Sequence, residues 1–262
     1  MTTTYDSISV ERVAQTEWIT FQRTKQMNAL SSQMLDETAN ALDVAMQDDA
    51  VRVVAITGSG RAFCAGADLK EVAGTTIAPG ERNMLDRVDS VFGTLRNGPK
   101  PVIAVVNGLA MAGGLELVMA CDLVFAAQSA KMGDAHSNFG VFPGAGGAAI
   151  LPNRIGLNRA KDLLFSGENV TSQQMMDWGL VNRVVADDDL RDAVQTYADK
   201  LSDKSPAVLR RMKTMANRAM NTDEQSALAE EMLHLLAHMR SWDMQEGLSA
   251  FAEKRKPKFR GY

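Results

Sequence analysis

The chain has 262 residues, of which 45% are hydrophobic and 23% charged, and its formal net charge is −4. This composition is typical of a globular protein with a large core, and the acidic balance argues against broad nucleic-acid binding. No apolar run approaches the roughly 20 residues that a membrane-spanning helix needs. The first residues show neither a signal-peptide core nor an Arg-rich transit sequence. We therefore expect a cytoplasmic protein with no membrane partner, and we expect Cys64 and Cys121 to be buried free thiols.

The N-terminal part is expected to start with a hairpin and a helix. Residues 8–13 and 17–21 have the alternating polarity of two half-buried strands. Ser31 or Ser32 can cap a helix that extends to about Asp48.

The next part alternates between strands and helices. Three apolar runs have the character of parallel strands that are buried on both faces: 51–57, 101–106 and 123–127. A loop is expected over residues 72–80, then a helix to about Leu95 and another over Gly113–Ala120. Strand, helix and strand at this spacing indicate an α/β domain.

Helical patterns dominate after about Leu157. They cover residues 159–164, 172–178, 190–201, 206–219, 223–239 and 241–253. Only residues 181–185 read as a strand in this part. We therefore predict two units, an α/β core over residues 1–195 and a helical C-terminal module over residues 196–262.

Two backbone turns stand out in the α/β part. Residues 60–70 read GRAFCAGADLK and residues 106–116 read VNGLAMAGGLE, and each segment follows a strand-like run. Each places small residues where the chain turns into a helix, so that free N–H groups point outward at the positive end of a helix dipole. If the two turns face one another, they form a site for a developing oxyanion, with Glu116 as a titratable group beside it. This combination predicts chemistry on a carbonyl group.

These turns and several further motifs, in the same order, resemble those of the crotonase superfamily, the enoyl-CoA hydratase/isomerase family. The resemblance extends over nearly the whole chain, and its further motifs are Cys121-Asp122 and residues 142–147, 179–182 and 251–256. It implies a crotonase-like α/β core, a spiral of ββα turns, with a helical C-terminal domain. It also implies that the C-terminal module joins subunits into a trimer or hexamer.

The resemblance further implies an acyl-CoA thioester as ligand, with CoA as part of the substrate rather than a cofactor. By matching positions, the N–H groups of Ala67 and Gly113 form the oxyanion hole that holds the thioester carbonyl oxygen. Contacts to CoA are implied for five residues, the last two reaching a neighbouring subunit: Ala65, Asp68, Leu69, Phe251 and Lys254.

One position departs from the pattern of typical hydratases in this family, which use two glutamates. Glu116 matches the first, and His136 stands at the second, in a register fixed by Gly133 and by residues 140–147. An imidazole can replace a carboxyl group as acid or base because its ordinary pKa lies near neutrality. We expect Glu116 to act on water and His136 to orient water or protonate the α carbon. A structural histidine is the alternative. Asp122 and Asp134 are interpreted as structural, although Asp134 is the better candidate of the two for a place in the site.

The sequence thus predicts a lyase that adds water to a 2-enoyl-CoA thioester, or removes it, through an enolate. The alternatives are an isomerase, decarboxylase or hydrolase on the same fold, or a non-catalytic acyl-CoA-binding paralogue. No metal is expected, because His234 and His238 have no evident third ligand, and the predicted reaction implies no redox cofactor. The expected partners are an acyl-CoA thioester and further copies of the chain in a homotrimer or homohexamer.

Overall fold

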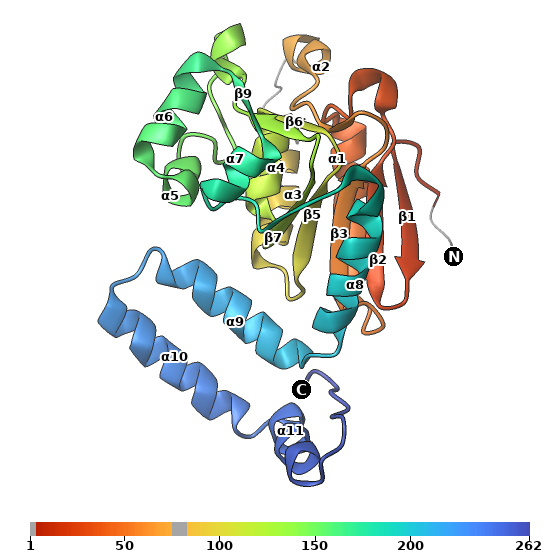
Figure 1. Cartoon of the computed structure of the whole chain (residues 1–262), viewed down its shortest axis with the longest axis vertical. Coiled ribbons are helices and arrows are strands. Elements are labelled where there is room, and N and C mark those ends of the chain that lie inside the picture. The colour runs from red at the N-terminus through yellow and green to blue at the C-terminus, as the bar shows by residue number, and fades with distance from the viewer. Residues whose placement is uncertain (1–3, 75–82) are drawn as a thin grey trace.

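The computed structural model describes residues 4–74 and 83–262 and is built around two sheets (Figure 1). The larger sheet has the strand order β1-β2-β3-β5-β7-β10. β1 and β2 are antiparallel, and the other neighbouring strands are parallel. Its strands are β1 (Ile8–Val13), β2 (Thr16–Phe21), β3 (Val53–Gly58), β5 (Val102–Val106), β7 (Leu123–Ala127) and β10 (Arg183–Val185).

The smaller sheet has the order β4-β6-β8-β9, and its neighbours are parallel except for β8 and β9. Its strands are β4 (Ala62–Cys64), β6 (Leu109–Met111), β8 (Lys131–Gly133) and β9 (Asn169–Thr171). Three residues are too few to show a period, so the sequence did not reveal these strands. β9 also corrects the expectation that residues 181–185 form the one strand after Leu157. Because β4, β6 and β8 each directly follow a strand of the larger sheet, the chain winds as repeated ββα turns, which confirms the predicted α/β spiral.

Helices cover the sheets on both sides. α1, α3 and α4 pack in succession, whereas α8 packs against β2, β3, β5 and β7 and lies in front of the larger sheet in Figure 1. The helices of the core are α1 (Ser32–Gln47), α2 (Leu69–Gly74), α3 (Met84–Asn97), α4 (Gly113–Ala120), α5 (Leu151–Ile155), α6 (Leu157–Ser166), α7 (Ser172–Asp177) and α8 (Leu190–Ser202). Short 3₁₀ turns are η1 (Thr24–Gln26), η2 (His136–Phe139) and η3 (Asp187–Asp189). The expected loop at 72–80 lies mostly outside the described residues, and its first three residues belong to α2.

Local sequence explains why the main elements form where they do. The Ser31 side chain accepts a hydrogen bond from the Met34 N–H and so caps α1, as predicted. Asn83 and Asp86 form a reciprocal capping box at the start of α3. β3 and β5 are almost wholly buried, which matches their solid apolar sequences. Both cysteines are buried free thiols, as expected, and burial raises the pKa of Cys64 to about 12.

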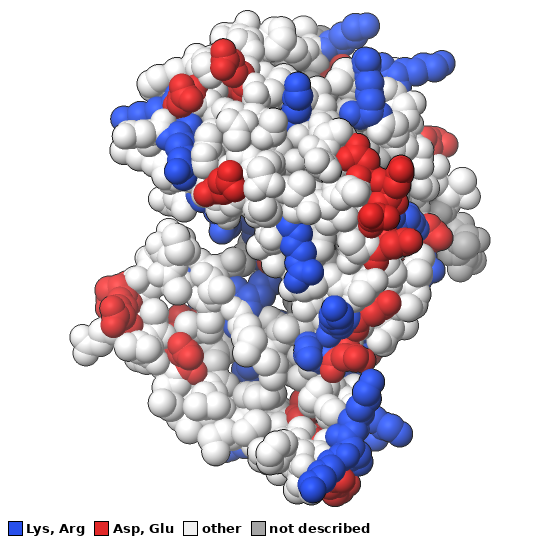
Figure 2. Space-filling model, in the orientation of Figure 1, with Lys and Arg blue, Asp and Glu red and all other residues white. Residues whose placement is uncertain are grey.

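The C-terminal helices lie below the sheets in Figure 1. They are α9 (Pro206–Ala219), α10 (Glu224–His238) and α11 (Trp242–Ala252). Lys213 of α9 connects the C-terminal helices to the core. Its ammonium group donates hydrogen bonds to the carbonyls of Leu95 and Lys100 and lies 2.7 Å from the carboxylate of Asp122. Figure 2 shows the surface hollowed between the two parts, where a cavity is lined from both sides. The predicted boundary at residue 195 falls inside α8, and the division into two domains stays a prediction.

Candidate active site

The turn between β6 and α4 presents to a pocket a backbone donor that has no partner among residues 4–74 and 83–262. Ala112 has φ 49° and ψ −118°, a conformation that costs a residue with a side chain of order 1–3 kcal/mol. The turn is held by the Ala112 N–H, which donates to the Gly133 carbonyl at the end of β8. The N–H of Gly113, the first helical residue, finds no acceptor among the described residues. A strained turn thus leaves a free donor at the start of α4.

The segment after β4 brings a second free donor beside the first. Leu30 bridges to this segment through bonds to the Gly66 carbonyl and the Asp68 N–H, which leaves the intervening Ala67 N–H without an acceptor in the described part of the chain. A methyl group added at Gly113 would lie 3.4 Å from the Ala67 nitrogen. Ala67 and Gly113 line the same pocket. The structure therefore brings together the two predicted oxyanion-hole residues from turns that are nearly fifty positions apart.

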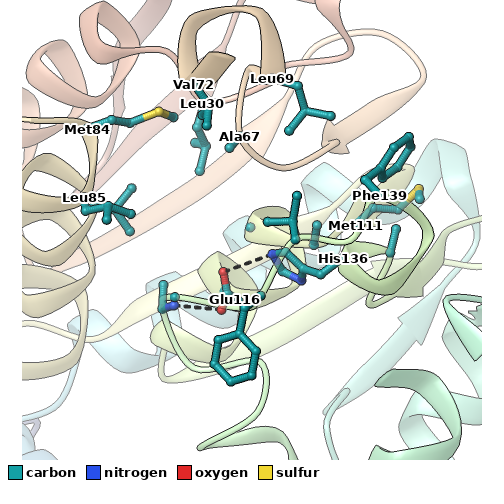
Figure 3. Close-up of a pocket in the computed structure, with 18 of the residues that line it drawn as sticks. Leu30, Ala67, Leu69, Val72, Met84, Leu85, Met111, Glu116, His136 and Phe139 are labelled. Atoms are coloured by element: carbon teal, nitrogen blue, oxygen red, sulfur yellow. Dashed lines mark hydrogen bonds and ion pairs between the residues drawn. The ribbon is translucent and has the colours of Figure 1, made fainter. Parts of the chain in front are cut away.

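Glu116 lies one turn into α4 and is held by backbone donors. Its side chain is buried, and the residue is only 3% exposed. One carboxylate oxygen, Oε1, accepts hydrogen bonds from the N–H groups of Ala145 and Gly147, both at 2.8 Å. The other oxygen, Oε2, lies 3.9 Å from Nε2 of His136 (Figure 3). The carboxylate is thus oriented from one side and presents its second oxygen to the imidazole.

His136 is the first residue of η2, shortly after β8, and it is paired with a buried carboxylate. Its Nδ1 lies 2.9 and 3.0 Å from the two carboxylate oxygens of Asp134. Burial by itself lowers the pKa of His136, but the hydrogen bond to Asp134 and the negative charges of Asp134 and Glu116 outweigh it. The pKa of His136 is therefore raised above its ordinary value.

The sequence favours a structural role for Asp134, with membership of the site as the alternative. The structure places this carboxylate in contact with His136, a predicted site residue. A signal was present in the spacing, because Asp and His two positions apart after a strand can form a hydrogen-bonded pair.

The pocket that joins these groups is apolar and has a volume of about 300 Å³. Glu116 and His136 lie on one side of it, and Leu30, Leu69 and Met84 lie on the other (Figure 3). Its remaining walls are mostly aliphatic and aromatic: Val72, Leu85, Val88, Phe92, Met111, Phe139, Val141 and Phe142. Such a lining suits a hydrophobic chain that ends in a polar reacting group.

The three core residues implied in CoA binding line this pocket or the groove that adjoins it. Ala65 and Leu69 line the pocket itself and also an open groove beside it. Asp68 lies in that groove and pairs with Arg23 at 2.8 Å, and the hydrogen bond from Arg23 lowers the pKa of Asp68. Lys25 and Lys70 also line the groove. A charged groove therefore continues directly from the apolar pocket.

Phe251 and Lys254 lie far from these residues in the sequence and do not line either hollow within one chain. Phe251 is 86% exposed at the end of α11. Their predicted contact with the ligand of a neighbouring subunit stays a prediction.

Within residues 4–74 and 83–262, no group of three or more His, Cys, Asp or Glu side chains is arranged to hold a metal ion. No helix in this part of the chain has the length and apolar character needed to cross a membrane.

Comparison with known proteins places this geometry in context. A family model described as enoyl-CoA hydratase/isomerase matches residues 11–262. The chain is 39% identical to a probable enoyl-CoA hydratase of Mycobacterium leprae, over 97% of this chain and 98% of that protein. It is 36% identical to a crotonyl-CoA hydratase of Syntrophomonas wolfei, over 97% and 98%. The crystal structure of an enoyl-CoA hydratase from Bacillus anthracis superimposes with a TM-score of 0.92 at 36% identity, over 98% of this chain and 100% of that one.

Proposed function

We propose that this chain, which belongs to the enoyl-CoA hydratase/isomerase family, catalyses the reversible addition of water to a 2-enoyl-CoA thioester. The names of the relatives support this reaction. One local observation carries the proposal: two backbone N–H groups, which have no acceptor in the described part of the chain, lie beside the Glu116–His136 pair in one apolar pocket.

The backbone donors suit the charge that hydration creates. We expect the thioester carbonyl oxygen to accept hydrogen bonds from the N–H groups of Ala67 and Gly113. When water adds to the β carbon, the electrons of the double bond move toward this oxygen and form an enolate. Donors that already point at the developing charge stabilise it, and each contributes about 2.7–4 kcal/mol.

The side chains suit the two proton transfers. The water oxygen bonds to the β carbon while the water proton passes to Oε2 of Glu116. Nε2 of His136 then gives a proton to the α carbon, and the enolate electrons re-form the carbonyl. The proton on Glu116 passes back to His136, which closes the cycle and leaves a 3-hydroxyacyl-CoA. The separation of 3.9 Å between Oε2 and Nε2 lets both atoms contact one water molecule.

The test is a product analysis. The protein is incubated with 2-enoyl-CoA thioesters of straight, branched and aromatic acyl chains, and the products are read by mass. The expected result is the gain of one water with the thioester intact. An unchanged mass with a moved double bond would indicate an isomerase, and loss of CoA or of carbon dioxide would indicate a hydrolase or a decarboxylase. Unaltered ligands across the panel would contradict an enzymatic role on these substrates.

The ligand and the assembly complete the proposal. Coenzyme A enters as part of the substrate, with no separate cofactor, and its path follows the groove of Ala65, Asp68 and Leu69. The tail beyond α11 is exposed and basic, and Figure 2 shows Lys and Arg gathered at this end of the molecule. These charges suit the phosphates of CoA bound to a neighbouring subunit, with Phe251 and Lys254 in contact.

The surface of α10 supports a trimer or hexamer. Large apolar side chains are exposed along this helix: Leu228, Met232, Leu233, Leu235 and Leu236. A continuous exposed apolar face is typical of a subunit interface. Light scattering that gives the mass of a monomer for the active protein would contradict this assembly. The cytoplasmic location stays a prediction from the sequence.

A further inference from the structure

We infer that Asp134 is a positioning residue of this site: it holds His136 as a proton donor aimed at the pocket, so that an Asp–His pair performs the role of one carboxylic acid. This inference rests on the proposed hydratase function, which assigns the proton transfer to His136.

The hydrogen bonds of Asp134 fix the imidazole. Asp134 follows β8 and is fully buried, at 0% exposure. Its carboxylate accepts from the His136 backbone N–H at 3.2 Å and lies 2.9 Å from Nδ1 of the same residue. Because a carboxylate only accepts, Nδ1 must carry the hydrogen. The ring is then held with Nε2 toward Glu116, where the proton to be transferred is needed.

Burial of the Asp134 carboxylate favours a protonated imidazole. A buried charge is strongly unfavourable unless a group of opposite charge compensates it. Among the described residues, His136 is the only cationic partner of Asp134. The charged side chains that act on the imidazole are Asp134 from the end of β8 and Glu116 from α4, and both are negative.

The charge of the three side chains explains how a histidine can stand where the family resemblance implies a second glutamate. A carboxylate facing a carboxylic acid carries one negative charge and one transferable proton. A pair made only of the Glu116 carboxylate and an imidazolium would carry no net charge. With Asp134 included, the three groups carry one negative charge and one transferable proton, as the two-glutamate pair does.

Asp134 is also packed against the loop that orients Glu116. A methyl group added at Gly147 would lie 2.8 Å from Oδ2 of Asp134. The N–H of the same glycine donates to Oε1 of Glu116. The absence of a side chain at Gly147 therefore lets both carboxylates approach one short piece of backbone.

The first experiment compares Asp134→Asn with the wild type by steady-state kinetics over a range of pH. The variant removes the charge and keeps the shape. We expect kcat to fall about 100-fold with little change in KM, because general acid–base catalysis contributes at least this much. We also expect the decline of kcat on the alkaline side to move to lower pH. An unchanged pH profile would overturn the inference. Asp187→Asn is the matched control. The Asp187 carboxylate also accepts one hydrogen bond from a backbone N–H and one from a side chain, both of Ser129, and Asp187 does not line the pocket.

The second experiment separates positioning from simple structural support. In a His136→Glu background the family's second carboxyl group is present, and Asp134 has no imidazole to hold. We expect Asp134→Asn to lower kcat much less in this background than in the wild type. An equal loss of kcat in both backgrounds would show a structural role and overturn the inference.

A third measurement does not depend on turnover. The chain has three histidines, so imidazole signals in ¹H–¹⁵N NMR spectra can be assigned with His136→Asn. We expect Asp134→Asn to move the titration of His136 to lower pH. If no enoyl thioester is hydrated but this titration moves, the proposed function fails and the positioning by Asp134 stands. If hydration occurs and the titration of His136 does not move, the proposed function stands and the positioning by Asp134 fails.

Discussion

The two halves of the pocket are made from different chemical groups. The half suited to the thioester oxygen consists of backbone N–H groups at Ala67 and Gly113. The half suited to proton transfer consists of side chains: Glu116, His136 and Asp134. Backbone donors depend on the path of the chain and carry no titratable proton, whereas the side-chain half depends on residue identity and on charge. The two halves should therefore respond differently to substitution and to pH.

The largest effect is expected at Glu116. Glu116→Gln keeps the shape and removes the base, so kcat should fall between about 10² and 10⁴-fold. Binding of a saturated acyl-CoA, measured by calorimetry, should persist because the backbone half is intact. Retained turnover would contradict the role of Glu116 in the proposed function.

The half of the pocket that consists of backbone N–H groups can be tested at Ala67. Ala67→Pro deletes the N–H, and kcat should fall about 10² to 10³-fold, the effect of losing one oxyanion donor. Since the N–H has no acceptor in the described part of the chain, no internal hydrogen bond is lost. The pH dependence of kcat should keep its shape, unlike that of Asp134→Asn.

Ala67→Gly is the matched comparison, because it changes the same position and keeps the N–H. Its kcat should exceed that of Ala67→Pro by at least about tenfold. Equal losses in the two variants would argue against an oxyanion donor at this position.

A smaller effect, on stability, is expected at Gly147, where the loop backbone approaches the carboxylates of Glu116 and Asp134. Gly147→Ala would place a methyl group 2.8 Å from both Oδ2 of Asp134 and Cβ of Pro143, so the loop must shift. We expect the free energy of unfolding to fall by about 1–3 kcal/mol, as in other overpacked sites. Gly93→Ala is the control, because a methyl group there meets nothing within 4 Å and sits within α3. Urea unfolding of both variants tests this, and equal stability would show that the loop adapts freely.

The smallest effect concerns stability and pH. The pKa of His136 is raised in the folded protein, so the imidazole binds a proton more tightly there than in the unfolded chain. Its contribution to stability is fully present below the ordinary histidine pKa of 6.5 and is lost as pH rises through the higher folded value. Asp134→Asn should weaken this dependence, and a series of urea unfolding curves over pH measures it. An identical pH dependence in both proteins would contradict the pairing.

Much of the larger sheet follows directly from the sequence. The apolar runs that predicted buried parallel strands became β3, β5 and β7, and the predicted bounds of α4 and α9 agree with the structure. These elements are long enough to show their period and caps locally. β4, β6, β8 and β9 are stabilised by pairing with residues distant in sequence, so three residues of local pattern could not reveal them.

The sequence by itself determined the residue types available to the site: small residues at two turns, an acid in the first turn of α4, and a histidine where the family resemblance implies a second acid. Only the tertiary structure decided which of these groups meet. It brought the Gly113 turn within contact of the Ala67 segment and placed Asp134 against the imidazole. The physical reason is that burial and charge pairing are properties of the assembled neighbourhood. A sequence states that Asp134 is an acid, whereas the fold makes it a buried acid whose cationic partner, within the described chain, is His136.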